Sequence, residues 1–130
     1  MFGVDLHTHT HISDGTFSPE QLVQAAVDLK IHMLAVTDHD TMDGLSSARK
    51  YAQDHDIQII SGVEISSQWS RPNTKKSYGV HIVALNMQDE TPIQAMLENQ
   101  KKVRAERAKV ICDLLEKCID FDIYPDVIAK

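Results

Sequence analysis

The chain has 130 residues, of which 42% are hydrophobic and 25% charged, and its formal net charge is −6 at pH 7. This composition is typical of one soluble globular domain and excludes a disordered tail, while the absence of a long apolar run and of a signal-like N-terminus predicts a cytoplasmic protein without membrane contact. The negative charge disfavours non-specific binding to nucleic acid unless bound cations reverse the local field.

The first half of the chain predicts alternating strands and helices, the pattern of an α/β fold. A strand is expected over 3–10, followed by a helix over 20–30. Ser18 has the position of the helix N-cap, and Gln21 has the position that closes a capping box. The continuous apolar run 33–37 predicts a parallel strand that is covered on both faces.

The second half continues the pattern with a helix over 44–53, a strand over 57–65, a polar loop over 71–76 and a strand over 78–85. Apolar residues then recur at helical spacing from residue 91 to Cys118, which predicts one long helix or a helix with one bend. Cys112 and Cys118 lie in this stretch without the spacing of a redox pair, so both are predicted to be reduced core residues. Residues 121–130 complete no further unit, and the α/β layout is therefore predicted to be unfinished.

Histidines occupy every second residue near the N-terminus, at His7, His9 and His11, with Asp5 before them. Alternate residues of a strand share a face, so these side chains are expected to point the same way. His7 and His9 can then reach one divalent cation, and Asp14 on the following turn can reach the same ion or a neighbouring one. The alternative is an incidental histidine-rich strand with solvated rings.

A second candidate ligand, His39, directly follows the apolar strand 33–37, where parallel α/β folds place functional groups. Asp38 or Asp40 could hold its second ring nitrogen, as outer carboxylates commonly do at metal sites. Alternatively, Asp40 or Asp43 caps the next helix.

Two further candidates lie on later strands. Glu64 is near the end of a buried strand, where a carboxylate is costly to bury unless a cation or a donor meets it, so a bridging role between two metals is predicted. His81 lies inside the apolar strand 78–85, where a histidine is either a satisfied core residue or a ligand.

Four motifs occur in order, DLHTHT-x-x-SDG, AVTDHDT, G-x-E and HIVAL, and together they resemble the PHP superfamily, named for polymerase and histidinol phosphatase. Within it, the chain is most similar to the N-terminal half of stand-alone phosphoesterases that act on nucleoside 3′,5′-bisphosphates and on the 5′ ends of short RNA. The resemblance implies a distorted, TIM-like β/α barrel with up to three divalent metal ions at the carboxyl ends of its strands.

The resemblance also implies a role for each matching position. His7 and His9 would hold the first metal, Asp14 and His39 the second, Glu64 would bridge the first and third, and His81 would bind the third. Asp5 would orient a neighbouring ligand, whereas His11 falls at a variable position. Imidazole and carboxylate ligands together favour manganese over magnesium, with zinc or iron as alternatives.

The chain departs from the family in length. The family's enzymes are about twice as long, and their later segments supply another histidine and a terminal Asp-x-His, whereas no histidine follows His81 here. Residues 1–130 are therefore expected to be the N-terminal portion of a truncated PHP domain. The alternatives are a second chain that completes the site and a remnant with weakened metal binding.

The function expected from this resemblance is metal-dependent hydrolysis of phosphate esters of small nucleotides or RNA 5′ ends, through a metal-bridging hydroxide. Arg104 and Arg107 match a family helix that faces a second phosphate, or they belong to a solvated helix face. Arg71, Lys75 and Lys76 could guide an anion, although a polar hairpin loop is the simpler interpretation. The alternative functions are a metallo-amidohydrolase and a non-catalytic PHP-type metal module.

Overall fold

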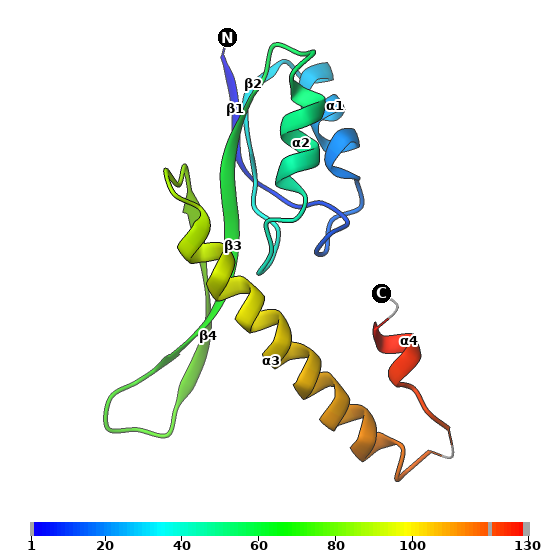
Figure 1. Ribbon diagram of the computed structural model, residues 1–130. Helices are drawn as coiled ribbons and strands as arrows, with labels where there is room; N and C mark the ends of the chain where they lie inside the picture. Colours follow the sequence, from blue (N-terminus) through cyan, green and yellow to red (C-terminus); the bar gives the residue numbers. More distant parts are fainter. Residues whose placement is uncertain (1, 120, 129–130) are drawn as a thin grey trace. The chain divides into compact units, whose positions relative to one another are not determined.

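The computed structural model describes residues 2–119 and 121–128, and the chain divides into two compact units, Met1–Glu90 and Thr91–Lys130. The first unit contains β1 (Gly3–Thr8), α1 (Pro19–Asp28), β2 (Ile31–Val36), α2 (Leu45–Ala52), β3 (Gln58–Ser70) and β4 (Ser77–Leu85) (Figure 1). The second unit contains α3 (Thr91–Leu115) and α4 (Tyr124–Ile128). Neither α3 nor any other helix among the described residues has the length and apolarity that crossing a membrane requires.

The strands of the first unit form one curled sheet in the order β1-β2-β3-β4. β1, β2 and β3 are parallel, whereas β4 runs antiparallel to β3. The sheet is therefore mixed, and β4 follows β3 through a hairpin instead of a helical crossover. The predicted α/β class is confirmed.

The hydrophobic core lies between the two helices of this unit and the middle of the sheet. The predicted capping box starts α1: the side chain of Ser18 accepts from Gln21 N at 3.2 Å, and Gln21 Oε1 accepts from Ser18 N at 2.8 Å. The buried core residues are Val23 and Ala26 of α1, Leu34 and Val36 of β2, and Ala48 and Ala52 of α2. Both helices thus cover the centre of the sheet.

β4 has a different environment from β2, although both are apolar in sequence. Leu34 on β2 is 1% exposed, whereas Val80 and Ile82 on β4 are 40% and 51% exposed. Within the first unit no helix packs on β4, since α1 and α2 contact β2 and β3. The central strands are therefore covered on the helix side, and β4 is not.

Several predicted boundaries change. β1 ends at Thr8 instead of residue 10, and β3 continues to Ser70 instead of residue 65, because β4 pairs with it from Gly62–Leu85 to Ser70–Ser77. The predicted loop 71–76 is confirmed as the turn that joins these strands.

Three expectations for helices and cysteines need correction. Gly44, which has no side chain that could accept a bond, occupies the N-cap of α2, a position that the sequence had assigned to Asp40 or Asp43. Cys112 is buried as predicted, but Cys118 is exposed. The described part of 121–130 also contains the short helix α4, which no sequence pattern had indicated.

Candidate metal centre

The end of β2 is joined to β3 by its main chain, and this pairing sets His39 opposite Glu64. Glu64 N donates to Asp38 O at 3.1 Å, and Asp40 N donates to Glu64 O at 2.9 Å. These bonds make an isolated parallel bridge between residues 39 and 64 beyond the regular ladder. The two side chains are therefore placed together by backbone geometry, at the carboxyl ends of neighbouring strands.

The end of β1 is tied to β2 in a similar way. Thr37 N donates to Thr8 O at 2.8 Å, and Thr8 N donates to Thr37 Oγ1 at 3.1 Å. His7 and His9 lie on either side of Thr8 in the sequence, and as alternate residues of an extended segment they point their side chains the same way. The end of β1 thus brings both imidazoles to the edge of the sheet formed by the carboxyl ends of the strands, where Glu64 lies.

A buried carboxylate holds the loop that carries Asp14. Asp38 is 1% exposed and accepts three hydrogen bonds of 2.7 Å, from Thr10 N, Thr10 Oγ1 and Ser13 Oγ. Gly15 closes this loop: a Cβ at that position would lie 2.2 Å from His9 O, so a larger residue would displace the backbone. The loop is therefore fixed on both sides of Asp14.

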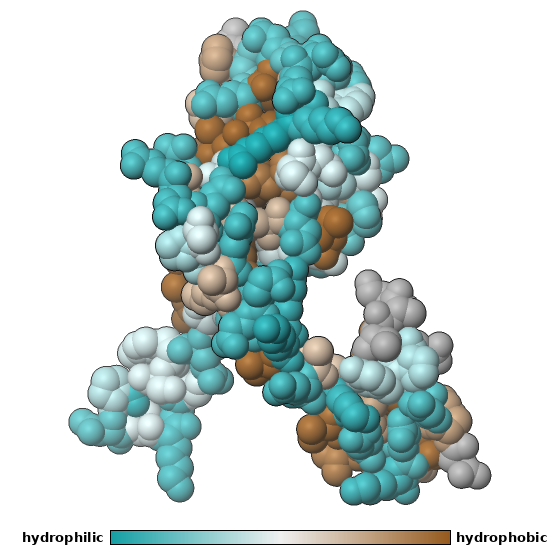
Figure 2. Space-filling model, viewed as in Figure 1, coloured by the Kyte–Doolittle hydropathy of each residue, from teal (hydrophilic) through white to brown (hydrophobic). Residues whose placement is uncertain are grey.

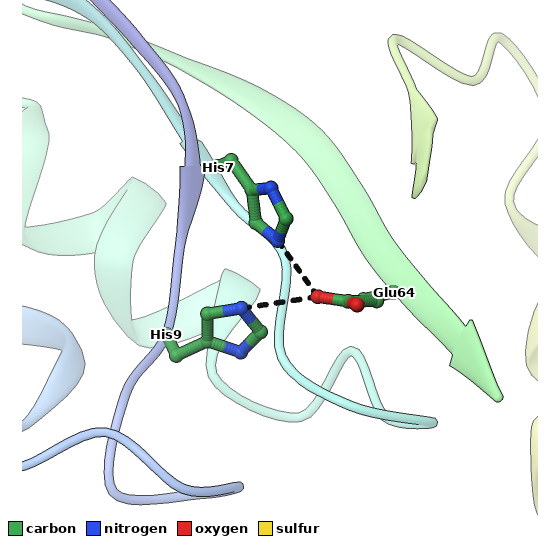
Figure 3. A group of neighbouring side chains, drawn as sticks. All are labelled: His7, His9 and Glu64. Atoms are coloured by element: carbon green, nitrogen blue, oxygen red, sulfur yellow. Dashed lines mark hydrogen bonds and ion pairs between the residues drawn. The ribbon is translucent and has the colours of Figure 1, made fainter. Parts of the chain in front are cut away.

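Glu64 lies between three histidines, of which Figure 3 shows His7 and His9. Its Oε2 is 2.7 Å from His7 Nε2 and 3.1 Å from His9 Nε2, while its Oε1 is 2.7 Å from His81 Nδ1. The Glu64 side chain is 9% exposed, whereas those of His7 and His81 are 55% and 52% exposed. One buried carboxylate therefore contacts imidazoles from both flanks of the sheet.

His39 and Asp14 complete the cluster. His9 Nδ1 is 3.3 Å from Asp14 Oδ1, and His39 Nε2 is 3.6 Å from Asp14 Oδ2 and 3.9 Å from Glu64 Oε2. Three overlapping donor groups result, each with ligand atoms within 4.8 Å of one another: His7, His9 and Glu64; His9, Asp14 and His39; and His39, Glu64 and His81. All six predicted ligands thus come together, although their ligand role itself remains a prediction.

The charge of Glu64 is strongly favoured. A hydrogen bond from His7 lowers the pKa of this carboxyl from its ordinary 4.5 to about 2, against burial, which raises it, and His81 adds a second lowering hydrogen bond. Glu64 is therefore a carboxylate at neutral pH, with both oxygens available as acceptors.

The donor spacing fits divalent cations. Ligand atoms about 2.1 Å from a tetrahedral ion lie about 3.4 Å from one another. The contacts that link the groups run from 2.7 to 3.9 Å, which brackets that value. Mixed imidazole and carboxylate donors are also the ligand types that transition metals such as manganese, iron and zinc accept. The residues therefore fit the metals that the sequence predicts.

Other predicted roles at this edge differ from expectation. Asp5 accepts from the backbone N–H of His7 at 3.4 Å instead of from an imidazole. His11 is exposed, with its Nδ1 3.3 Å from Phe17 O, which agrees with its exclusion from the ligand set. Among the described residues, buried His39 Nδ1 has no hydrogen-bond partner.

The expected support of His39 by Asp38 or Asp40 was wrong. Asp38 bonds the loop residues Thr10 and Ser13, and Asp40 Oδ1 accepts from the backbone N–H of Ser66 at 2.7 Å. Both carboxylates therefore hold main chain in place around the ligands, and neither bonds the ring. The sequence did not reveal Thr10 as a partner; the available signal was that a carboxylate directly after a buried strand requires donors.

Arg104 and Arg107 lie on α3 in the second unit and are exposed. Neighbouring ion pairs on that helix, Lys101–Glu98 and Lys109–Asp113, show that part of its surface is a solvated charged face. The phosphate-binding role of the two arginines remains a prediction.

Comparisons with known proteins identify relatives over most of the chain. A family model described as PHP domain matches residues 5–117. A 5′-3′ exoribonuclease of Haemophilus influenzae is 42% identical over 87% of this chain and 39% of its own length. A 3′,5′-nucleoside bisphosphate phosphatase of Chromobacterium violaceum is 35% identical over 89% of this chain and 39% of its own.

A solved structure agrees with the fold. An amidohydrolase from Chromobacterium violaceum, with bound sulfate, shares 34% sequence identity with a TM-score of 0.73, over 90% of this chain and 39% of that one. The curled mixed sheet of the first unit is thus a half-barrel that matches the N-terminal part of such structures. The chain spans about two fifths of the length of these relatives.

Proposed function

The chain belongs to the PHP domain family, and we propose that it is a metal-dependent phosphoesterase that hydrolyses phosphate esters of small nucleotides or RNA 5′ ends. The observation that carries this proposal is the interlocking of three donor groups through Glu64, His9 and His39. Two relatives, named as an exoribonuclease and a bisphosphate phosphatase, act on phosphate esters, which supports the same reaction type.

The ligand assignment follows the donor groups. His7 and His9 would hold one cation, Asp14 and His39 a second, and His81 a third, with Glu64 shared between the first and the third, so that each neutral imidazole uses its one lone pair on one cation. Manganese suits this mixed set better than magnesium, with zinc or iron as alternatives. Three cations need more ligands than these six side chains supply, so later segments of a longer protein, a second chain or water would complete their coordination.

The chain's own residues prepare the site for an anionic substrate. Bound divalent cations would supply neutralising charge and a water of lowered pKa at neutral pH. The carboxyl of Glu64 stays ionised, and its charge is shared by the two oxygens that face different donor groups. Asp38 fixes the loop that carries Asp14. Arg104 and Arg107 would bind a second phosphate of a bisphosphate substrate, since a guanidinium group matches phosphate oxygens.

The test is phosphate release from adenosine 3′,5′-bisphosphate by the manganese-loaded chain. His9→Ala removes a member of two donor groups, so kcat/KM should fall at least about a hundredfold. His11→Ala is the matched control, because His11 belongs to the same short segment but to none of the three groups. It should leave kcat/KM within about twofold of wild type.

The alternatives give different results. A chain that binds stoichiometric manganese without hydrolysing either the bisphosphate or 5′-phosphorylated RNA would be a non-catalytic metal module. A chain that cleaves an amide C–N bond and leaves phosphate esters intact would be an amidohydrolase, the name given to one structural relative. Either result would contradict the proposed phosphoesterase.

A further inference from the structure

β3 and β4 extend beyond the rest of the sheet as a two-stranded ribbon, residues 65–82. β2 pairs with β3 only as far as Ser61, the bridge between His39 and Glu64 follows, and Asp40 Oδ1 accepts from Ser66 N one step further along β3. Beyond Ser66, the strand pairing is between β3 and β4, up to Ser70–Ser77 (Figure 1). The ribbon therefore begins at the metal centre and leads away from it.

The two faces of this ribbon differ in chemistry. Directly paired residues share a face, and Glu64 and His81 define the face of the metal centre. The same face carries Ser66, Gln68, Gly79, Ser70 and Ser77, whereas the reverse face carries Ser67 and the larger apolar and aromatic residues Ile65, Ile82, Val80, Trp69 and Tyr78. A track of small polar residues thus runs from His81 toward the end of the ribbon.

This track is open. A Cβ added at Gly79 would meet nothing within 4 Å, and Gln68 and Ser70 are exposed. In Figure 2 the projecting end of the ribbon is coloured teal and white, without a brown patch. An extended polar ligand therefore has room to lie along this face.

The ribbon is also the one long segment without negative charge in an acidic chain. Residues 65–88 contain no Asp or Glu, although the whole chain has a formal net charge of −6. The turn at its end carries Arg71, Lys75 and Lys76, all exposed, and among the described residues no carboxylate pairs with any of them. Three uncompensated cations are thus placed at the end of the polar track.

The turn is held in a defined shape. Arg71 N donates to Lys76 O at 3.1 Å, Thr74 N donates to Arg71 O at 3.2 Å, and Asn73 has the left-handed φ of 61° that asparagine tolerates. Behind the turn, the rings of Trp69 and Tyr78 pack across the strands with centroids 5.9 Å apart. Such a pair stabilises the ribbon near its tip.

We infer that the polar face of the ribbon and its basic turn bind the sugar-phosphate backbone of single-stranded RNA whose 5′ end lies at the metal centre. Hydroxyl and amide groups of Gln68, Ser70 and Ser77 suit ribose and phosphate oxygens, and the cations of the turn suit phosphates. This inference rests on the proposed function and narrows its substrate to an RNA strand.

The dimensions set the length of strand that is needed. Arg71 lies five residue steps after Ser66, which at about 3.4 Å per residue is about 17 Å of ribbon. A stacked strand rises about 3.4 Å per nucleotide along its axis, so roughly five stacked nucleotides cover that distance. An octanucleotide should therefore reach the turn, and a dinucleotide should not.

The experiment measures binding of 5′-phosphorylated octaadenylate with cleavage-resistant phosphorothioate linkages to the manganese-loaded chain, by fluorescence anisotropy at several salt concentrations. The test variant is Lys75→Gln/Lys76→Gln. Its matched control, Lys30→Gln/Lys50→Gln, makes the same charge change beside the amino end of β2 and on α2. Phosphate release from adenosine 3′,5′-bisphosphate is measured in parallel.

The test variant should bind the octanucleotide about fivefold more weakly. The slope of the logarithm of the binding constant against the logarithm of salt concentration should be shallower by about 1.4, or 0.7 for each lost phosphate contact. The control and the dinucleotide should show neither change. Equal affinity and slope in the test and control variants would overturn the inference. If the wild-type chain releases no phosphate but the ribbon effect is present, the proposed activity fails while the RNA-binding surface stands.

Discussion

β2 and β4 are both apolar strands next to β3, but they lie in opposite environments. Leu34, Ala35 and Val36 on β2 are at most 3% exposed, whereas Val80 and Ile82 on β4 are 40% and 51% exposed. The reason is that α1 and α2 pack over the centre of the sheet and leave β4 uncovered. An apolar pattern thus indicates a strand, but the elements packed against it decide what it buries.

The same contrast divides the metal centre. The His39 and Glu64 side chains, at the covered centre of the sheet, are 22% and 9% exposed. Those of His7 and His81, on the flanking strands, are 55% and 52% exposed. The centre therefore consists of a fixed inner part and a more open outer part, and variants should affect the two parts differently.

The largest difference is expected between two core-type substitutions. Leu34→Ala leaves a cavity under α1 and α2 and should lower the free energy of unfolding by about 3 kcal/mol. Ile82→Ala removes a half-exposed side chain and should cost less than about 1 kcal/mol. Urea denaturation followed by circular dichroism measures both. Equal losses would show that β4 is covered in solution.

A smaller effect is expected from Asp38→Asn. The amide cannot accept all three hydrogen bonds of the carboxylate, so the free energy of unfolding should fall by about 2 kcal/mol. Manganese affinity, measured by titration calorimetry on folded protein, should also fall, because the loop carrying Asp14 is loosened. Asp54→Asn, at an exposed position, is the control. Unchanged affinity in Asp38→Asn would show that this carboxylate acts on stability alone.

The smallest expected effect is on the free energy of unfolding at acidic pH. Because the pKa of Glu64 is lowered to about 2 in the folded metal-free chain, ionised Glu64 stabilises the fold fully above about pH 4.5. That contribution is lost as pH falls from 4.5 toward 2. The difference in unfolding free energy between wild type and Glu64→Gln should therefore shrink by about 1–2 kcal/mol over this interval, less than the roughly 3 kcal/mol that the pKa change alone gives, because the partners His7 and His81 are half exposed and water screens them. Glu106→Gln, at an exposed position, is the control, and urea denaturation at successive pH values provides the measurement.

The sequence predicts much of this architecture because its signals are local. The capping box at Ser18 and the buried strand ending at Val36 depend on neighbours in the chain, and both were predictable. The extension of β3 to Ser70 depends on pairing with β4, so the apolar pattern alone stopped too early.

Within the metal centre the same distinction holds. The six donors could be predicted from motif order, and the structure brings them together. The bonds from Asp38 to Thr10 and Ser13 could not be predicted, because they join residues that are distant in sequence. From the sequence alone, several other donors in the chain could satisfy that carboxylate equally well. Partner choice is settled only in three dimensions.

The division of Glu64 between two of the donor groups has a thermodynamic consequence. Its Oε2 contacts His7 and His9, and its Oε1 contacts His81. A cation bound at one oxygen would orient the side chain for a cation at the other, whereas repulsion between the two cations would oppose filling both groups. The affinities of the two groups for the proposed cations would therefore be linked, and each cation would change the affinity for the other by the same factor.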